Sequence, residues 1–304
     1  EIGYNLLSYF PDLKIEYLTK STSGDKDLKT PLSKMSSAGV FTDDLRKNLI
    51  QNKCDIIVHS WKDLPIDLGN DTMIAGTIKR SDQRDILFIK KNNVLNIQKK
   101  KIISILSSSP RRVYNLELFA KNYLPFGIKK VEFLNIRGNI PTRFKKFING
   151  SDDAFIVAKA AIDRLLNNKL EEFDQLKNLI QTYIENCLWT ITPLSLNPTS
   201  PGQGALACEI RKNDKFSNKL LKQINNIEDY NCVQKERKLL EKYGGGCHQK
   251  IGISFFKTHF GIMHSSKGEV EKGNSFQYWK KLTSERKFKR KIYSKKIFPE
   301  NLKD

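Results

Sequence analysis

The chain is poor in cysteine and contains neither a paired cysteine motif nor a long apolar run. Its five cysteines are scattered without any C-x-x-C pair, a spacing that argues against a zinc ribbon, thioredoxin-type chemistry and a disulfide framework. No apolar segment approaches the ~18 residues needed to span a bilayer. No basic-then-apolar signal segment opens the chain, which begins at Glu1 without a methionine. We therefore expect a cytoplasmic protein without a membrane span, and an incomplete N-terminus.

Acidic residues are outnumbered by basic ones. The chain has 53 lysines and arginines against 33 aspartates and glutamates, which gives a formal net charge of +20. This excess favours an acidic partner such as nucleic acid, anionic lipid or a polycarboxylate ligand. Charge alone does not choose among these partners, and lysine- and asparagine-rich stretches such as 90–93 fit a solvated surface equally well.

The first half of the chain repeats one pattern, in which a short β-branched run is followed by a polar turn and a helical segment. This pattern predicts βα units around a parallel sheet. The runs lie at 56–58, 102–106, 131–136 and 154–157, and basic side chains follow each of them. Helical periodicity at 165–186 predicts a helical insert, strand-like runs lie at 206–210, 251–256 and 259–263, and a basic tail covers 280–296. Because 304 residues exceed what one core usually serves, we expect two or three domains.

One predicted helix begins with an unusual charge. Ser109 can cap its start, with Pro110 at the first helical position. Arg111 and Arg112 then fall in the first turn, where the helix dipole disfavours cations. We expect a negative group to compensate them. Since ligands of open α/β sheets bind beyond the carboxyl ends of the strands, the basic residues at these junctions are expected to face a shared anion site.

A run of three glycines at 244–246 precedes Cys247. Glycine permits positive φ and close backbone approach, so Cys247 is expected on a tight, exposed loop. The loop and the neighbouring His248 could provide the accessible, electropositive setting that a thiolate nucleophile needs, although a chemical role for His248 itself is the less favoured interpretation. The remaining cysteines are expected to be inert: Cys54, Cys187, Cys208 and Cys232.

Several motifs occur in a fixed order along the chain. They are VHSWKDLP at 58–65, SSPRR at 108–112, RGN at 137–139 followed by Thr142 and Arg143, an arginine at 164, GQGA at 202–205 and GGC at 245–247. In this order, up to about position 264, the sequence resembles the hydroxymethylbilane synthase (porphobilinogen deaminase) family.

The resemblance implies a fold of class α/β. It implies two periplasmic-binding-protein-like (type II) α/β domains with a cleft between them, plus a small α+β C-terminal domain that carries the cofactor cysteine. We predict domain 1 at 1–80 and 198–224, domain 2 at 81–197 with the helical insert near 166–190, and domain 3 at 225–304 with the basic tail.

The resemblance also implies an activity. Members of the family are transferases of tetrapyrrole (heme) biosynthesis that deaminate four porphobilinogen molecules and join them head to tail, releasing hydroxymethylbilane and ammonia. The chain grows on a dipyrromethane primer, which is expected as a thioether on Cys247. A cytoplasmic monomer is expected, with uroporphyrinogen-III synthase as the receiver of the product and with no metal, nucleic-acid or membrane partner.

The site residues are carried over by motif. Asp63 is expected as the catalytic acid beside Lys62, where a carboxylate can assist loss of ammonia and stabilise the resulting cation. The expected cofactor-binding residues, besides Cys247, are Ser60, Lys62, Ser108, Ser109, Arg111, Arg112, Arg137 and Gly138. The expected substrate-binding residues are Arg143, Arg164, Gln203 and Lys34. Arginines suit this task because they bind carboxylates through paired, charge-assisted hydrogen bonds. For Asp63 and the serines, helix capping is the structural alternative.

The sequence departs from the family pattern in places. The family begins with a strand and an RxSxLA motif that also holds the cofactor, and nothing before Glu1 supplies it. Lys34 matches the first lysine of the family's mobile loop, whereas Ala38 stands where a second lysine is usual. The helical insert and the basic tail also have no counterpart in the pattern.

Two other classes of function remain open. A non-catalytic anion-binding protein of periplasmic-binding-protein fold would also have two lobes around an arginine-lined cleft, but it needs neither Asp63 nor Cys247. Nucleic-acid binding through the basic tail would show the salt dependence of counterion release, but no aromatic-interleaved recognition motif supports it.

Overall fold

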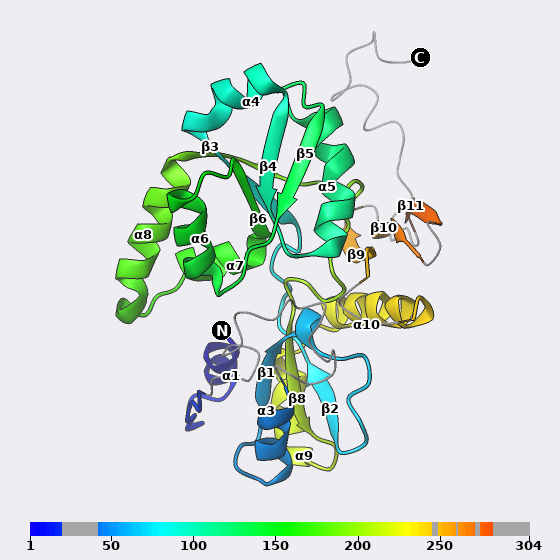
Figure 1. Ribbon diagram of the computed structural model, residues 1–304. Helices are drawn as coiled ribbons and strands as arrows, with labels where there is room; N and C mark the ends of the chain where they lie inside the picture. Colours follow the sequence, from blue (N-terminus) through cyan, green and yellow to red (C-terminus); the bar gives the residue numbers. More distant parts are fainter. Residues whose placement is uncertain (20–41, 245–248, 260, 271–273, 282–304) are drawn as a thin grey trace, which may run out of the picture.

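The computed structural model describes residues 1–19, 42–244, 249–259, 261–270 and 274–281. Lys34, Ala38, Cys247 and His248 lie outside these ranges, as does the part of the basic tail beyond residue 281. Figure 1 shows two lobes, with helix α10 (Ile227–Lys242) and a third sheet beside their junction.

The larger lobe contains a five-stranded sheet of order β5-β4-β6-β3-β7. Its strands are β3 (Asp85–Lys90), β4 (Ile102–Leu106), β5 (Lys130–Leu134), β6 (Ala154–Ala158) and β7 (Cys187–Ile191). Strand β4 runs parallel to β5 and β6, whereas β3 runs antiparallel to β6 and β7. The helices of this lobe are α4 (Val94–Lys100), α5 (Pro110–Tyr123), α6 (Ile140–Asn149), α7 (Lys159–Leu166) and α8 (Asp174–Glu185).

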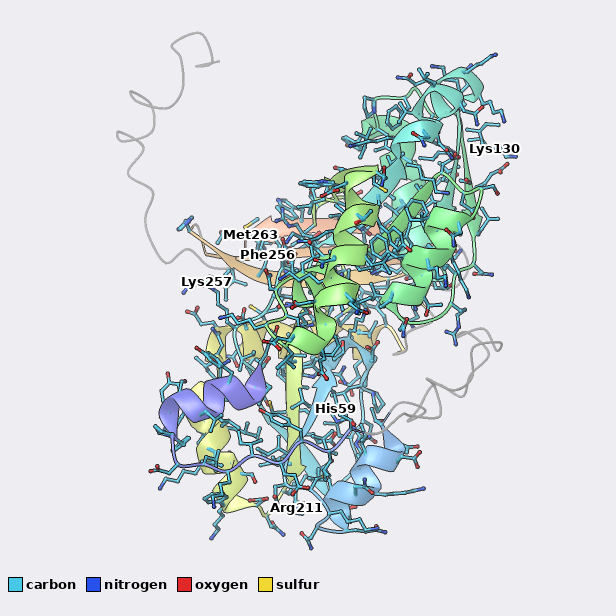
Figure 2. The ribbon with its side chains drawn as sticks, turned by 90° about the vertical axis from the view of Figure 1, so that its left-hand side faces the viewer. His59, Lys130, Arg211, Phe256, Lys257 and Met263 are labelled. Carbon is cyan, nitrogen blue, oxygen red and sulfur yellow. The ribbon has the colours of Figure 1, made fainter. Side chains whose placement is uncertain are left out.

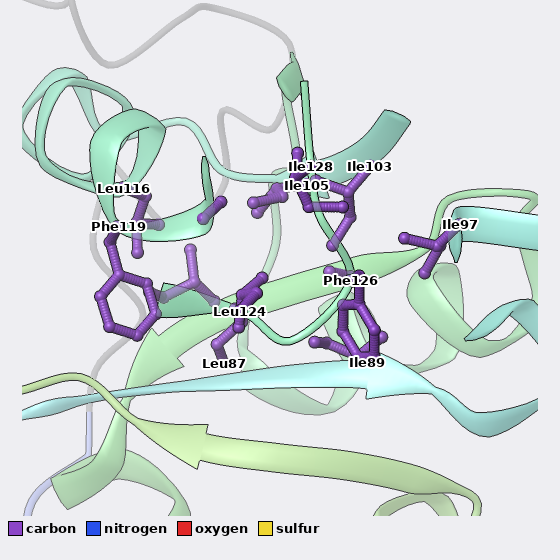
Figure 3. Close-up of a cluster of buried hydrophobic side chains, with 13 residues drawn as sticks. Leu87, Ile89, Ile97, Ile103, Ile105, Leu116, Phe119, Leu124, Phe126 and Ile128 are labelled. Atoms are coloured by element: carbon purple, nitrogen blue, oxygen red, sulfur yellow. The ribbon is translucent and has the colours of Figure 1, made fainter. Parts of the chain in front are cut away.

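Strand β3 is buried on both faces of this sheet. Leu87 belongs to the cluster under α5 that Figure 3 shows, and Phe88 belongs to the cluster under α6. Successive side chains of a strand point to opposite faces, so the unbroken apolar run of β3 supplies both cores. In the second cluster the rings of Phe144 and Phe155 meet edge to face, with centroids 5.3 Å apart.

The smaller lobe has a three-stranded antiparallel sheet of order β1-β8-β2. Its strands are β1 (Ile57–Ser60), β2 (Thr72–Gly76) and β8 (Leu206–Arg211). Helices α1 (Ile2–Tyr9), α3 (Asp43–Ile50) and α9 (Lys215–Ile224) accompany it. Figure 2 shows His59 and Arg211 in this lobe, and the core there includes Leu6 and Ile210.

The third sheet is formed by β9 (Gly252–Thr258), β10 (Gly261–Glu269) and β11 (Ser275–Lys281), in the order β11-β10-β9. All of its pairings are antiparallel. Helix α10 contacts β9, and the buried side chains of Cys232, Leu240 and Ile253 lie in the cluster that they share.

The α/β class expected from the sequence is confirmed, but the predicted parallel sheet is parallel only among β4, β5 and β6. Strands β3 and β8 are antiparallel to their neighbours because each follows a segment that crosses from one lobe to the other. The expected helical insert near 166–190 is also too long: α8 ends at Glu185, and Cys187–Ile191 forms the edge strand β7. The first two residues of the expected basic tail, 280 and 281, are the end of strand β11.

Candidate active site

The short helix η2 (Trp61–Asp63) follows directly on strand β1. The side chain of Trp61 is buried and its ring packs against Tyr230, with centroids 5.3 Å apart. The backbone N–H of Trp61 donates to the carbonyl of Ala205 at 3.0 Å. These contacts fix a turn whose last residue, Asp63, is exposed. A rigid turn that displays a carboxylate suits the role expected for Asp63.

The GQGA segment at 202–205 passes close to this turn, and its glycines make that approach possible. Gly202 has φ +79°, and a Cβ there would lie 3.1 Å from the backbone nitrogen of Lys62. Gly204 has φ +87°, and a Cβ there would lie 2.6 Å from the carbonyl oxygen of Ser81. A side chain at either position would have a strained backbone, and at Gly204 it would also clash with the Ser81 carbonyl. The segment therefore belongs to the site.

The arginine pair at the start of α5 lies where the motif predicted. Ser109 accepts a hydrogen bond from the backbone nitrogen of Arg112 at 3.4 Å, and Pro110 occupies the first turn. The Arg111 and Arg112 side chains are buried, and each donates to Asp85, at 3.0 and 2.7 Å. The negative group that the sequence required is therefore Asp85, a residue that no motif indicated.

Asp85 is itself fully buried and accepts two further hydrogen bonds. Gln203 Nε2 donates to it at 2.8 Å and Asn197 Nδ2 at 3.1 Å. Burial raises the pKa of Asp85, but the guanidiniums of Arg112 and Arg111 outweigh burial and hold that pKa well below its usual range. Asp85 is therefore a carboxylate at every physiological pH.

Further cations lie near this pair. Burial and the charges of Arg112 and Arg137 together lower the pKa of Arg143 to about 10, against the opposing charge of Asp63. Arg143 Nε donates to the carbonyl of Gly138 at 2.6 Å. The Asp63 carboxylate and these three arginines therefore share one electrostatic neighbourhood.

Gly138 allows the RGN turn to close. Its φ is +114°, and a Cβ there would lie 2.8 Å from Thr142 Cγ2. The following Asn139 caps α6 by accepting a hydrogen bond from Thr142 N at 2.9 Å. The expected cofactor-binding glycine thus has a clear role in placing the helix that carries Arg143.

Lys62 is next to Asp63 and is half-buried. Burial lowers the pKa of its ammonium, and the charges of Arg112 and Arg111 act in the same direction, whereas Asp63 and Asp85 raise it. Lys62 therefore gives up its proton more readily than an ordinary lysine.

Three further residues expected to bind ligand are also held by protein groups. Ser108 Oγ donates to the Ile136 carbonyl at 2.6 Å and accepts from its N–H at 2.9 Å, and Ser109 caps α5. Arg164 Nη2 donates to the Gly204 carbonyl at 2.9 Å. Ser60, the last residue of β1, is half-buried. The ligand-binding roles of these residues remain predictions.

The arrangement suits a ligand with several carboxylates. The cations of this neighbourhood outnumber its carboxylates, and the Nε atoms of Arg111 and Arg112 are buried with no hydrogen-bond partner among the described residues. A buried donor without a partner is costly, and an oxyanion would satisfy it. In the described part of the chain no cluster of His, Cys, Asp and Glu could hold a metal ion, and no helix is long and apolar enough to cross a membrane.

Comparisons with known proteins identify relatives over most of the chain. A family model described as "Porphobilinogen deaminase, dipyromethane cofactor binding domain" matches residues 4–219. A porphobilinogen deaminase of Chlorobium phaeobacteroides is 33% identical over 260 residues, which cover 85% of this chain and 74% of that protein. A porphobilinogen deaminase of Syntrophomonas wolfei is 34% identical over 260 residues, which cover 85% of this chain and 76% of that protein.

Among solved structures, a probable amino-acid ABC transporter extracellular-binding protein of Bacillus subtilis is 14% identical, with a TM-score of 0.36 over 79% of this chain and 83% of that one. The family model and the curated relatives, together with the ordered motifs around Asp63 and the arginines, identify the family: the chain belongs to the porphobilinogen deaminases.

Proposed function

We propose that this chain is a hydroxymethylbilane synthase that converts four porphobilinogens and one water into hydroxymethylbilane and four molecules of ammonia. The observation that supports this most is the convergence of an exposed carboxylate, Asp63, with the buried arginines of α5 and the half-buried Arg143 of α6, beside the glycine-lined crossing at 202–205. An acid alone or an anion site alone would fit many proteins. Together they match a reaction on a cationic, carboxylate-bearing substrate.

The residues present fit a dipyrromethane cofactor. Its acetate and propionate groups would be held by Arg111, Arg112 and Arg137, whose neighbourhood has an excess of positive charge. Cys247, which lies outside the described residues, would carry it as a thioether. When bound, the cofactor supplies the nucleophilic pyrrole carbon to which the first substrate is joined.

Asp63 would act on the porphobilinogen side chain. Departure of its amine leaves a positive charge on the substrate pyrrole, and a fixed carboxylate next to the pyrrole nitrogen stabilises that charge. Asp63 and Lys62 can also exchange protons with the leaving amine, since the Lys62 pKa is lowered by burial. Arg143 and Arg164 would orient the substrate carboxylates during this step, with Gln203 and Lys34 as further contacts.

The cellular context is part of the proposal and rests on the family. We infer a cytoplasmic monomer that passes its product to uroporphyrinogen-III synthase. We also infer the three-part domain division, with domain 1 at 1–80 and 198–224, domain 2 at 81–197 and domain 3 at 225–304.

The mass of the intact protein tests the proposal. The chain and its Cys247→Ala variant would be expressed in a porphobilinogen-producing host, with Cys54→Ala as the matched control. We expect an added dipyrromethane mass in the parent chain and in Cys54→Ala, and none in Cys247→Ala. Purified parent protein should then release ammonia and hydroxymethylbilane from porphobilinogen. A bare polypeptide mass in all three proteins, together with tight binding of polycarboxylates, would favour the non-catalytic anion-binding alternative.

A further inference from the structure

The inference concerns Asp85, the first residue of β3. It is fully buried, and its two oxygens accept hydrogen bonds from four side chains, those of Arg111, Arg112, Asn197 and Gln203. None of the motifs that define the site includes it. A carboxylate without contact to solvent does not bind a diffusing ligand, so its function must be exerted through its partners.

These partners come from separate parts of the chain. Asp85 follows the crossing from the smaller lobe to the larger one, and Arg112 lies in the first turn of α5. Asn197 and Gln203 lie on the return crossing. The hydrogen bonds from Asp85 therefore join both crossings to the helix that carries the arginine pair. Arg111 strengthens the same junction by donating to Asn197 Oδ1 and to the Pro198 carbonyl, each at 3.0 Å.

Two adjacent guanidiniums in the first turn of a helix repel each other and the helix dipole. Asp85 counters both effects because Oδ2 binds Arg111 and Oδ1 binds Arg112. Asp85 uses one nitrogen of Arg112, Nη2, while Nε is buried without a partner among the described residues. Arg112 is thus held in a fixed orientation, and its Nε–H can still donate a hydrogen bond to another anion.

We propose that Asp85 is the positioning residue of the arginine pair, and that it orients Arg112 toward the carboxylates bound in the site. The identity of those carboxylates, on cofactor and porphobilinogen, rests on the proposed function. The positioning itself does not, because any polycarboxylate in the site would depend on it. Geometry and charge make opposite predictions here: loss of Asp85 removes a negative charge, which by itself would strengthen anion binding, but it also releases the arginines.

The experiment uses three variants in a Cys247→Ala background, so that every protein lacks cofactor. Asp85→Asn keeps the shape and removes the charge. The exchange variant Asp85→Asn/Asn197→Asp restores a carboxylate beside Arg111, which already donates to residue 197, but leaves Arg112 facing an amide. Glu117→Gln removes an exposed acid from the same helix and is the control. The probe is benzene-1,3,5-tricarboxylate, measured by calorimetry, and thermal unfolding is followed in parallel.

We expect Asp85→Asn to lower the unfolding temperature by about 10 °C, because a buried ion cluster loses its central charge. We expect its affinity for the tricarboxylate to fall about tenfold, the loss of one well-oriented charge-assisted contact. The exchange variant should unfold within a few degrees of the parent but bind the probe as weakly as Asp85→Asn. Glu117→Gln should match the parent in both measurements.

Recovery of both stability and probe affinity in the exchange variant would mean that Asp85 serves the fold alone, and it would overturn the proposal. Tighter probe binding by Asp85→Asn would overturn it as well, since charge would then outweigh orientation. The proposed function is judged separately, by the dipyrromethane mass of the protein with Cys247 intact. A protein that lacks this mass but follows the expected pattern with the tricarboxylate would refute the function and keep the positioning role.

Discussion

Arg80 and Glu236 form a buried, two-pronged ion pair that joins the crossing between the lobes to helix α10. Arg80 Nη1 and Nη2 donate to the two oxygens of Glu236 at 2.8 and 3.0 Å. The same carboxylate accepts the backbone N–H groups of Gly202 and Phe255, each at 2.7 Å. One glutamate thus connects both crossings and the third sheet to α10.

Substitution of Glu236 should destabilise the whole protein. In Glu236→Gln the Arg80 guanidinium stays buried without its counter-charge, a change that typically costs about 3–5 kcal/mol. We expect a corresponding decrease in the free energy of unfolding measured in urea. Glu228→Gln is the control, because Glu228 pairs with Lys257 on the surface of the same helix and exposed pairs contribute about 1 kcal/mol or less. Equal losses in both variants would contradict the central role of Glu236.

Asp63→Asn should separate catalysis from folding. Because Asp63 is exposed, its amide variant should unfold within about 0.5 kcal/mol of the parent. Removal of a group that acts in acid–base catalysis typically lowers the rate about 10²–10⁴-fold. The measurement is kcat for ammonia release from porphobilinogen. Asp67→Asn, a nearby exposed acid that binds the Gly69 N–H, should keep its rate, and a normal rate in Asp63→Asn would exclude Asp63 as the acid.

The stability provided by Asp85 should depend on pH in one direction. Its folded-state pKa lies below the ordinary value of 3.8, so its contribution is complete above that pH and is lost as the pH falls below it. The difference in unfolding free energy between the parent and Asp85→Asn should therefore be constant from pH 6 to 8 and shrink below about pH 4. Other carboxylates titrate in both proteins and cancel. A difference that grows on acidification would contradict the ion-pair assignment.

The buried thiols should resist alkylation in the native protein. Burial raises the pKa of Cys187 and of Cys232 to about 11 and that of Cys208 to about 12. At pH 8 the thiolate fraction is then at least roughly 100-fold smaller than that of a free cysteine. Iodoacetamide should therefore label these residues at least about 100-fold more slowly than a free cysteine. The labelling is followed by peptide mass. Labelling in urea is the control, and equal rates in both conditions would show that these thiols are accessible.

The helix α8 is expected to be an integral part of the larger lobe. Its Ile180 is fully buried in the cluster that contains Phe144. Ile180→Ala should reduce the free energy of unfolding by about 2–5 kcal/mol, the range for truncation of a buried isoleucine. Leu179→Ala, on the exposed side of the same helix, should cost less than 1 kcal/mol or so. Similar small costs at both positions would mean that the helix does not contribute to the core.

The local features of the site could be derived from the sequence. Ser109 and Pro110 predicted the start of α5, and the structure has the cap and the first turn there, because a helix start depends on interactions within four residues. The helix dipole likewise required a counter-charge for Arg111 and Arg112. The class of the fold followed from the alternation of strand and helix patterns, since periodicity reports which faces are buried.

The tertiary structure alone decided which residue supplies that counter-charge. Asp85 precedes Arg112 by 27 positions and Gln203 by 118, and no pattern of spacing relates them. Its one signal was an acid directly before the apolar run at 86–89. The antiparallel directions of β3 and β8 were equally hidden, because a strand's composition records its burial and not its direction. Pairing between distant segments is set by packing of the complete chain, so charge partners and strand directions appear only in the folded protein.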